Sequence, residues 1–528
     1  MEGPWARRLP RVFFAVLLLL GGLVHRDYGV SWDEVNNHLN GLVSLNYAAR
    51  QLTPELAQRV TAGHSPIPDI RQYHDSDHGP VFEMVVSVLG YALTDGDARP
   101  LYFLRHLLVF CMFVLGVWGL YCIGRWRFRD WRWGLVTSLL LVLSPRFFAE
   151  AFYNGKDVVF MALFTLAVAG LLWMRERPSP GRVLVLGILT ALATDIRVQG
   201  LLVVLPTLVV LLRLPAGVYS SSRRAFLIMV YLAATLAVAF LGWPYLWATP
   251  LTELWAAFYR LKSYSWAETC LYFGKLIPSN QLPWHYLPVW ILITTPVAYS
   301  LLALLGLSRQ LTRLFRSQGA CLRSIAAQAD AWFSLWLLGP VLVVMGTRAV
   351  VYDGWRHVYF IYPALLLFTV QGLRFLVRVV SARRPMRWVA GALLAAALLE
   401  LPLTAVRMVR MHPFQNVYFS FLPAPLAEQW FERDYWGLAF RQGLEWLLTH
   451  DASPQITIQM VSMQEPLYNN SLLLPQAERA RIQYQPNARA RYFITSYRWH
   501  PQSYLDSVGR EVYHIRAEGV KILSIFQR

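Results

Sequence analysis

Long apolar runs that recur along the chain are the feature that most limits how this protein can fold. A helix needs about 20 residues to cross the hydrocarbon layer of a bilayer. Eleven runs are candidates: 11–25, 101–124, 134–147, 158–174, 183–194, 198–212, 225–247, 286–308, 331–347, 357–373 and 388–406. Only 15% of the 528 residues are charged, whereas soluble domains carry about a quarter. A secreted disulfide scaffold, a disordered chain and a cytosolic Rossmann enzyme are therefore excluded.

Arginines accumulate in every second loop between these runs. The basic segments are 7–11, 125–132, 175–182, 213–224, 309–323 and 374–387. Because loops rich in Lys and Arg stay in the cytoplasm, we expect a cytoplasmic N-terminus and, after eleven crossings, a C-terminus on the other side. The net charge of +18 is then mainly a topology signal, and no nucleic-acid partner is expected.

Two segments do not fit a simple spanning pattern. Residues 81–93 are apolar but short and carry Glu83, and counting them as a span would move the basic segment 125–132 to the outside. We interpret them as a helix at the membrane surface. Asp195 and Arg197 separate two runs that are each short for a span. Charges at such depth usually face a cavity rather than lipid.

The chain changes character after the last run. Residues 1–407 hold all the apolar runs and a large outer loop at 26–100, whereas 408–528 are richer in proline and polar residues. Residue patterns predict strands at 455–463, 491–497 and 511–526, and a helix at 426–449. The predicted fold is an α-helical polytopic membrane protein of about 11 transmembrane helices with a small C-terminal α/β domain outside the cytoplasm.

Acidic residues open the first outer loop, in the sequence Ser31-Trp32-Asp33-Glu34. Ser31 and Glu34 have the S-x-x-E spacing of a capping box, and Asp33 near a helix N-terminus favours the helix dipole. These structural roles alone would explain why Asp33 and Glu34 stand at the start of a helix. The functional alternative is that Asp33 acts as a general base on a substrate hydroxyl, with Glu34 as its substitute or helper.

Two D-x-D sequences follow, Asp75-Ser76-Asp77 and Asp95-Gly96-Asp97. Such a pair can hold a divalent ion against a nucleotide diphosphate, but no nucleotide sugar is expected outside the membrane. We interpret both as solvated loop acids. No metal ligands are assigned, and a divalent metal stays possible as a cofactor.

Cations stand next to three outward-facing helix ends. Lys156 and Asp157 precede an apolar run, where Asp157 is a natural N-cap and Lys156 can snorkel to the interface. Arg356 and His357 precede another run, and Arg197 lies at a third boundary. The functional alternative is that these cations and helix N–H groups together hold the phosphate of an anionic lipid. Their convergence is not visible in the sequence.

These residues, in this order, resemble the membrane-embedded GT-C glycosyltransferases. The likeness is greatest to the branch with the protein O-mannosyltransferases, the lipid A aminoarabinose transferases and the RgtA/B/C/D-like proteins. It rests on Trp32-Asp33-Glu34, His78-Gly79-Pro80-Val81, Arg105, Asn154-Gly155-Lys156-Asp157 and Thr194-Asp195-Ile196-Arg197. It covers roughly residues 10–215. Gly79 stands where relatives have proline, and Arg197 falls a few residues beyond their usual lysine.

The resemblance implies a glycosyltransferase of the family 39 type in a multi-pass membrane location, which we expect to be a bacterial inner membrane. Its donor would be a polyprenyl- or dolichyl-phosphate sugar, and its acceptor a glycan, lipid or protein on the outer face. Transfer would invert the anomeric carbon, with Asp33 as base. Lys156 and Arg197 are implied to contact the donor phosphate, with His78 and Asp157 as further site candidates.

Arg356 and His357 join the phosphate-binding candidates on charge alone. Two alternatives stay open: a transporter or flippase of an anionic or lipid-linked substrate, and a non-catalytic scaffold with the same fold. Transporters concentrate their binding groups near the bilayer midplane, whereas here the ionisable groups lie in outer loops.

Overall fold

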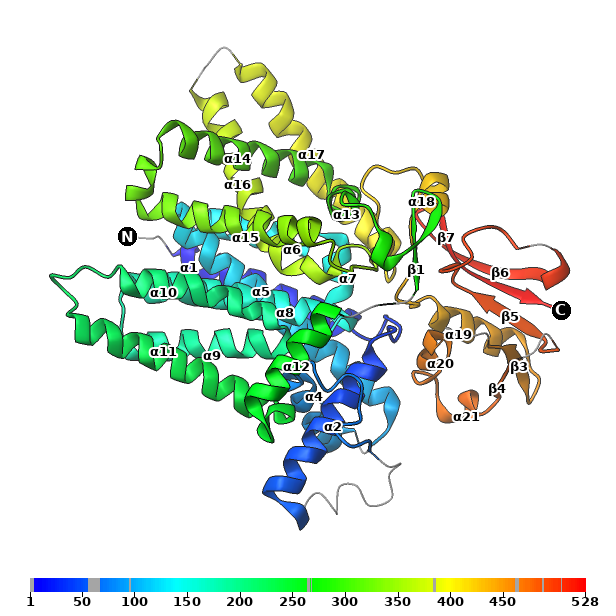
Figure 1. The fold of residues 1–528 in the computed structure, drawn as a ribbon. Helices are drawn as coiled ribbons and strands as arrows, with labels where there is room; N and C mark the ends of the chain where they lie inside the picture. The colour runs from blue at the N-terminus through cyan, green and yellow to red at the C-terminus, as the bar shows by residue number, and fades with distance from the viewer. Residues whose placement is uncertain are drawn as a thin grey trace.

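The computed structural model of the protein describes residues 4–55, 67–94, 96–263, 266, 268–382, 386–460, 465–486, 489–504 and 506–528. Helices dominate it, and the long ones lie side by side in one bundle with a sheet at one end (Figure 1). The predicted helical polytopic fold with a small C-terminal α/β part is confirmed.

All eleven predicted runs are largely helical. In chain order the helices are α1 (Trp5–Val24), α5 (Ala98–Phe128), α6 (Trp131–Val142) with α7 (Pro145–Tyr153), α8 (Asp157–Glu176), α9 (Pro180–Ile196), η1 (Val198–Val203) with α10 (Val204–Leu212), α11 (Ser221–Gly242), α13 (Tyr286–Thr294) with α14 (Val297–Arg316), α15 (Ile325–Thr347), η5 (Arg356–Ile361) with α16 (Tyr362–Ser381), and α17 (Arg387–Met411). Proline marks two of the interruptions, at Pro145 and Pro296, because it favours the first turn of a new helix over the interior of an old one.

Not every helix is long and apolar enough to span a membrane by itself. Within the described residues six helices meet that test, or seven if α6 and α7, bent by 72°, form one span. The others are short, as α9 and α10 are, or carry arginines, as α1 does with Arg7, Arg8 and Arg11. The count of eleven crossings therefore stays a prediction.

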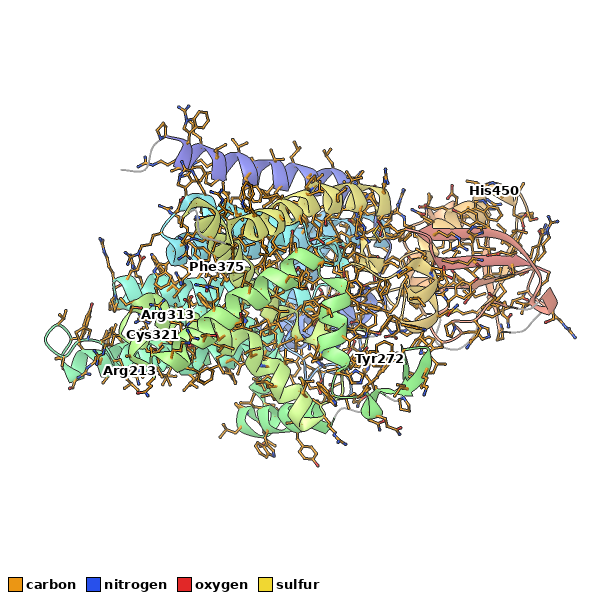
Figure 2. The ribbon with its side chains drawn as sticks, turned by 90° about the horizontal axis from the view of Figure 1, so that it is seen from above. Arg213, Tyr272, Arg313, Cys321, Phe375 and His450 are labelled. Carbon is orange, nitrogen blue, oxygen red and sulfur yellow. The ribbon has the colours of Figure 1, made fainter. Side chains whose placement is uncertain are left out.

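The two ends of the bundle differ in charge and content. The N-terminus and the loops with Arg213 and Arg313 lie at one end, and the C-terminal region with His450 lies at the other (Figures 1 and 2). Shorter elements join the second end: α2 (Glu34–Leu52), α4 (Val81–Leu93), α12 (Pro250–Ser263), and the hairpin of β1 (Thr269–Tyr272) and β2 (Lys275–Pro278). This separation agrees with the alternation of basic loops in the sequence.

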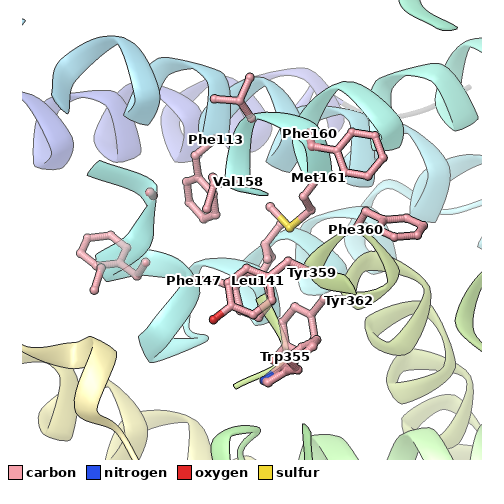
Figure 3. Close-up of a cluster of buried hydrophobic side chains, with 14 of the residues drawn as sticks. Phe113, Leu141, Phe147, Val158, Phe160, Met161, Trp355, Tyr359, Phe360 and Tyr362 are labelled. Carbon is pink, nitrogen blue, oxygen red and sulfur yellow. The ribbon is translucent and has the colours of Figure 1, made fainter. Parts of the chain in front are cut away.

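A buried aromatic cluster fixes the helices that carry the site (Figure 3). Phe147 of α7 stacks on Tyr362 of α16 with ring centroids 4.1 Å apart. Phe160 of α8 packs on Phe360 of η5 at 5.1 Å. Aromatic pairs in these geometries add about 0.5–1.5 kcal/mol each to the free energy gained by burial. The starts of α8 and η5 are thereby held together.

The C-terminal region is built on a mixed five-stranded sheet. Its strand order is β4-β3-β5-β7-β6, with β3 parallel to β4 and β5, and β7 antiparallel to β5 and β6. The strands are β3 (Ile456–Gln459), β4 (Ile482–Gln485), β5 (Tyr492–Thr495), β6 (Arg510–Ala517) and β7 (Val520–Gln527). The three predicted strand regions are strands in the structure, although 461–463 lie outside the described residues. The strand β4 was not predicted.

The predicted single helix at 426–449 is wrong. The segment forms α18 (Ala424–Trp430) and α19 (Phe440–His450), separated by a turn. Gly437 in this turn has φ +74°, which a glycine adopts without strain, and Asp434 accepts a hydrogen bond from the Ala439 N–H at 2.9 Å. Two short helices, α20 (Glu465–Ser471) and α21 (Gln476–Arg479), follow.

A reporter fused after Arg528 should lie outside the cytoplasm, because the basic loops and the C-terminal sheet occupy opposite ends of the bundle. The test is a paired alkaline phosphatase and fluorescent-protein fusion in intact cells. The same reporters inserted at residue 217, in a basic loop, serve as the cytoplasmic control. A cytoplasmic signal from the C-terminal fusion would rule out an odd number of crossings.

Candidate functional site

Asp33 pairs with an arginine from a distant part of the chain. It is the N-cap of α2, and its Oδ2 accepts a hydrogen bond from Arg356 Nη1 at 2.6 Å. The Asp33 side chain is 28% exposed and that of Arg356 only 5%. Burial by itself would raise the pKa of Asp33, but Arg356, helped by Lys156, holds that pKa below its ordinary value. Asp33 is therefore ionised at neutral pH and oriented by Arg356.

Asp157 lies beside this pair and joins two of the predicted cations. Its Oδ2 is 3.5 Å from Arg356 Nη1, and its Oδ1 pairs with Arg197. The prediction that Asp157 caps α8 is wrong, because the helix begins at Asp157 itself and the Asn154 side chain accepts the Asp157 N–H at 2.8 Å. The carboxylate is thereby left to bind the two arginines.

Asp195, two residues before Arg197, packs tightly against the start of α4 and the segment before it. The Val81 N–H lies 3.4 Å from Asp195 Oδ1, and a Cβ added to Gly79 would collide with the Asp195 carbonyl oxygen. This contact explains why a glycine stands at position 79 where the resembled family has proline. The segment before α4 and the end of α9 touch backbone to backbone.

Lys156, the N-cap residue of α8, differs from the arginines because it is not paired with a carboxylate in the described part of the chain. It is half-buried, and in the part of the chain that the structure describes it makes no hydrogen bond or ion pair. Burial lowers its pKa and Arg197 adds to that effect, while Asp75, Asp33 and Asp157 oppose it. Lys156 therefore interacts electrostatically with the Asp33 and Asp157 carboxylates without forming an ion pair with either.

His78 forms a possible metal-binding group with the preceding acids. Its Nδ1 is 3.0 Å from Asp77 Oδ1 and 3.8 Å from Asp75 Oδ1, and one ligand atom from each residue lies within 4.8 Å of the others. Carboxylate and imidazole ligands suit several divalent cations, although the same groups also form ion pairs without one. Asp77 is 6% exposed, so its interpretation as a solvated acid is wrong. Asp95 of the second D-x-D lies outside the described residues.

Glu34 points away from Asp33 into the protein. It is fully buried, with Oε1 3.3 Å from Arg105 Nε and 3.1 Å from His106 Nε2. Its Oε2 accepts the Ser31 N–H at 2.6 Å, which is one half of a capping box. The other half is absent, because the Ser31 hydroxyl donates to the Tyr153 carbonyl instead. This position favours a bracing role for Glu34 over that of a helper base.

His357 lies next to Arg356 and within electrostatic reach of Arg197, Asp33 and Lys156. Its ring packs edge-on against Tyr352, with centroids 4.6 Å apart. Its Nδ1 is buried and, among the residues that the structure describes, has no hydrogen-bond partner. All the predicted site residues except Glu34 therefore converge on one region, which sequence spacing could not establish.

Sequence reasoning missed three site residues: Asp353, which lies three residues before Arg356, and Arg498 and Glu432, which are far from Asp353 in sequence. The Asp353 carboxylate forms ion pairs with Arg356 Nη2 at 3.2 Å and with Arg498 Nη2 at 2.6 Å. Asp353 and Gly354 form a turn with φ values of +56° and +72°. Arg498 comes from the C-terminal region and also lies over the Trp32 ring at 5.0 Å. Glu432 is buried nearby, and burial together with Asp353 raises its pKa above the ordinary value. The aromatic and basic sequence 497–500 is a signal that could have pointed to Arg498.

Comparison with known proteins gives one match to a family model. Residues 77–243 match the family described as dolichyl-phosphate-mannose-protein mannosyltransferase. The resemblance to the GT-C glycosyltransferases is confirmed. The matched segment contains His78, Lys156, Asp157 and Arg197 but neither Asp33 nor Arg356. Among curated proteins nothing matches.

Several solved structures are similar at low identity. ArnT from Cupriavidus metallidurans bound to undecaprenyl phosphate has a TM-score of 0.47 and 14% identity, with 97% of each chain covered. The apo oligosaccharyltransferase from Archaeoglobus fulgidus has a TM-score of 0.47 and 12% identity, with 91% of this chain and 65% of that chain covered. This chain thus spans less than two thirds of the oligosaccharyltransferase.

Gly79→Ala should destabilise the protein, because the added Cβ meets the Asp195 backbone, which cannot move without shifting Arg197. Overpacking costs about 1–3 kcal/mol. Thermal unfolding of the purified protein in detergent measures the effect. Gly391→Ala is the matched control, since a Cβ there meets nothing within 4 Å. Equal melting temperatures for the two variants would contradict the close contact at Gly79.

Proposed function

We propose that this protein is an inverting, family 39-like glycosyltransferase that moves a sugar from a polyprenyl-phosphate donor to an acceptor at the outer face of a bacterial inner membrane. Residues 1–407 would form the transferase domain, and 408–528 an extracytoplasmic domain that completes the site. The family match over 77–243 supports the reaction class.

The observation that carries the proposal is the convergence of an ionised acid with several cations at one end of a helical bundle. Asp33, Asp157 and Arg356 come from segments up to 323 residues apart and are in direct contact. Lys156 and Arg197 adjoin them. A base for the acceptor and a positive site for a leaving phosphate are the two requirements of sugar transfer from a lipid phosphate.

Lys156 is the best candidate to bind the donor phosphate. Arg197 and Arg356 already have carboxylate partners, so a phosphate would have to compete for them. Lys156 has no such partner in the described part of the chain. It also adjoins the first turn of α8, and N–H groups at a helix N-terminus favour anions.

In the proposed step, Asp33 takes the proton of the acceptor hydroxyl as its oxygen attacks the anomeric carbon from the side opposite the phosphate. The bond from that carbon to the phosphate oxygen breaks, and polyprenyl phosphate leaves with the electron pair. Lys156 stabilises the charge that develops on the phosphate. Arg356 keeps Asp33 ionised and fixes its direction.

Asp33→Asn should lower turnover by about 10²–10⁴-fold, because the amide keeps the side-chain shape but does not accept a proton. Donor binding and protein yield should persist, since Arg356 retains Asp157 and Asp353 as partners. The measurement is transfer from a panel of radiolabelled undecaprenyl-phosphate sugars by purified protein in liposomes that contain host envelope lipids and glycans.

Glu34→Gln is the control for this variant. It should lower the melting temperature but reduce turnover far less than Asp33→Asn does, because Glu34 contacts Arg105 and His106. Wild-type turnover in Asp33→Asn would remove Asp33 from the mechanism. Wild-type protein that moves the labelled lipid across the bilayer without transferring sugar would favour a flippase instead.

Lys156→Met should weaken the apparent affinity for the donor roughly ten- to a hundredfold, since a hydrogen bond to a charged group contributes about 1.5–3 kcal/mol. Lys156→Arg, which keeps the charge, should recover part of the loss. The matched control is Lys275→Met, at an exposed lysine in β2. Titration of donor concentration in the same liposome assay measures the effect, and an unchanged affinity in Lys156→Met would assign this lysine to snorkelling.

A further inference from the structure

The five residues before Asp33 are held by the C-terminal region rather than by the bundle alone. Trp32 donates its N–H to the carbonyl of Trp436 at 3.1 Å. Arg441 of α19 donates to the carbonyl of Tyr28 at 2.9 Å. The segment 28–32 thus reaches Asp33 along a path set by residues more than 400 positions later in the chain.

Asn470 makes the most complete of these contacts. Its Oδ1 accepts the Val30 N–H at 2.9 Å, and its Nδ2 lies 3.0 Å from the Val30 carbonyl. One side chain therefore pairs with both backbone groups of Val30, as a neighbouring strand would. The same Nδ2 lies 3.0 Å from the Gly437 carbonyl and 2.7 Å from that of Pro466.

The pair of hydrogen bonds between Asn470 and the Val30 backbone, called the clamp below, is buried and closely fitted. Val30 and Asn470 are both 0% exposed, so water cannot replace either hydrogen bond. A Cβ added to Gly29 would collide with Asn470 Oδ1 and would lie 2.6 Å from the Leu438 carbonyl. No side chain larger than hydrogen fits between the first loop and the C-terminal region at this point.

We propose that Asn470 is a positioning residue of the transfer reaction, which sets the place of Asp33 by clamping Val30. This inference rests on the proposed function, in which Asp33 is the base. Val30 lies three residues before Asp33, and the intervening Ser31 and Trp32 are themselves bonded through their N–H groups. A displacement of about 1 Å at a reacting group can cost on the order of a hundredfold in rate.

The donor contacts do not depend on the clamp. Lys156 and Arg197 are carried by the start of α8 and the end of α9, and the described hydrogen bonds of Asn470 go to Val30, Gly437 and Pro466 instead. Loss of the clamp should therefore affect kcat and leave the KM for the donor nearly unchanged. A residue that only stabilised the fold would not separate the two constants.

The test compares wild type, Asn470→Ala and Ser471→Ala as full-length protein in the same liposomes of host envelope lipids and glycans. The donor probe is the undecaprenyl-phosphate sugar of the panel that wild type transfers, and the readout is release of undecaprenyl phosphate. Ser471 is the matched control, because it is buried on the same helix but its hydroxyl bonds within the C-terminal region, to the Tyr468 carbonyl and to Tyr484. Hydrogen exchange of the peptide that covers 27–33 reports the Val30 amide directly.

We expect Asn470→Ala to lose about ten- to a hundredfold in kcat, to keep the donor KM within about threefold and to exchange faster at 27–33. Ser471→Ala should match wild type in all three. Asn470→Asp keeps the shape and the acceptor for Val30 N–H but loses the donors, so it should fall between wild type and Asn470→Ala, and it replaces that variant if the alanine does not fold.

Faster exchange at 27–33 with wild-type kcat would overturn the clamp, as would parallel losses in kcat and donor KM. An inactive wild type on every donor of the panel would instead overturn the proposed function, and Asp33→Asn run in parallel separates the two failures. Active wild type, inactive Asp33→Asn and fully active Asn470→Ala would refute the clamp alone.

Discussion

The ion pairs of Arg356 are the interaction on which the rest of the site depends. One guanidinium contacts Asp33, Asp157 and Asp353, and so joins the start of α2, the start of α8 and the turn before η5. Arg498 extends the same network into the C-terminal region through Asp353. Arg356 is only 5% exposed, and a buried charge needs such ionic partners. The network therefore holds four parts of the chain in one arrangement and gives Asp33 its direction and its ionised state.

The sequence predicted the helices well because their signal is local. An apolar run long enough to span a bilayer has few alternatives to a helix, and all eleven runs are largely helical. The prediction of one helix at 426–449 was wrong because it used only this local signal. Apolar residues continue on both sides of a turn, and the turn depends on Gly437 and on the hydrogen bond between Asp434 and Ala439. Asp33, Lys156, Arg197 and Arg356 could each be identified as candidates from their places next to helix ends. Their meeting could not, because it depends on packing between segments that lie 40 to 323 residues apart. Arg498 and Asn470 lie further still, in a region whose strands carried no catalytic pattern.

The C-terminal region is joined to the bundle by polar contacts that are buried, which distinguishes it from a loosely attached appendage. Arg498 binds Asp353, Asn470 binds Val30, and Trp436 accepts the N–H of Trp32. Asn469, in the sequon Asn469-Asn470-Ser471, is only 4% exposed, so it is not presented for glycosylation in the folded protein. A buried backbone group without a partner costs about 1–3 kcal/mol, and Asn470 and Trp436 each supply such a partner to the segment 28–32. The path of the segment 28–32 toward Asp33 is thus set partly by the C-terminal region.

The charge balance around Asp33 also bears on the form of the proposed donor. Three arginines, Arg197, Arg356 and Arg498, contact three aspartates, Asp157, Asp33 and Asp353, so their charges are largely compensated within the protein. Of the four cations described at the site, Lys156 alone has no hydrogen bond or ion pair in the described part of the chain. A sugar linked to a lipid through one phosphate is a phosphodiester with a single negative charge, and one such cation matches it. A diphosphate link would bring a second charge, which would have to displace a carboxylate from an arginine and so disturb the contacts that orient Asp33. Under the proposed function, the site is therefore better suited to a monophosphate-linked donor.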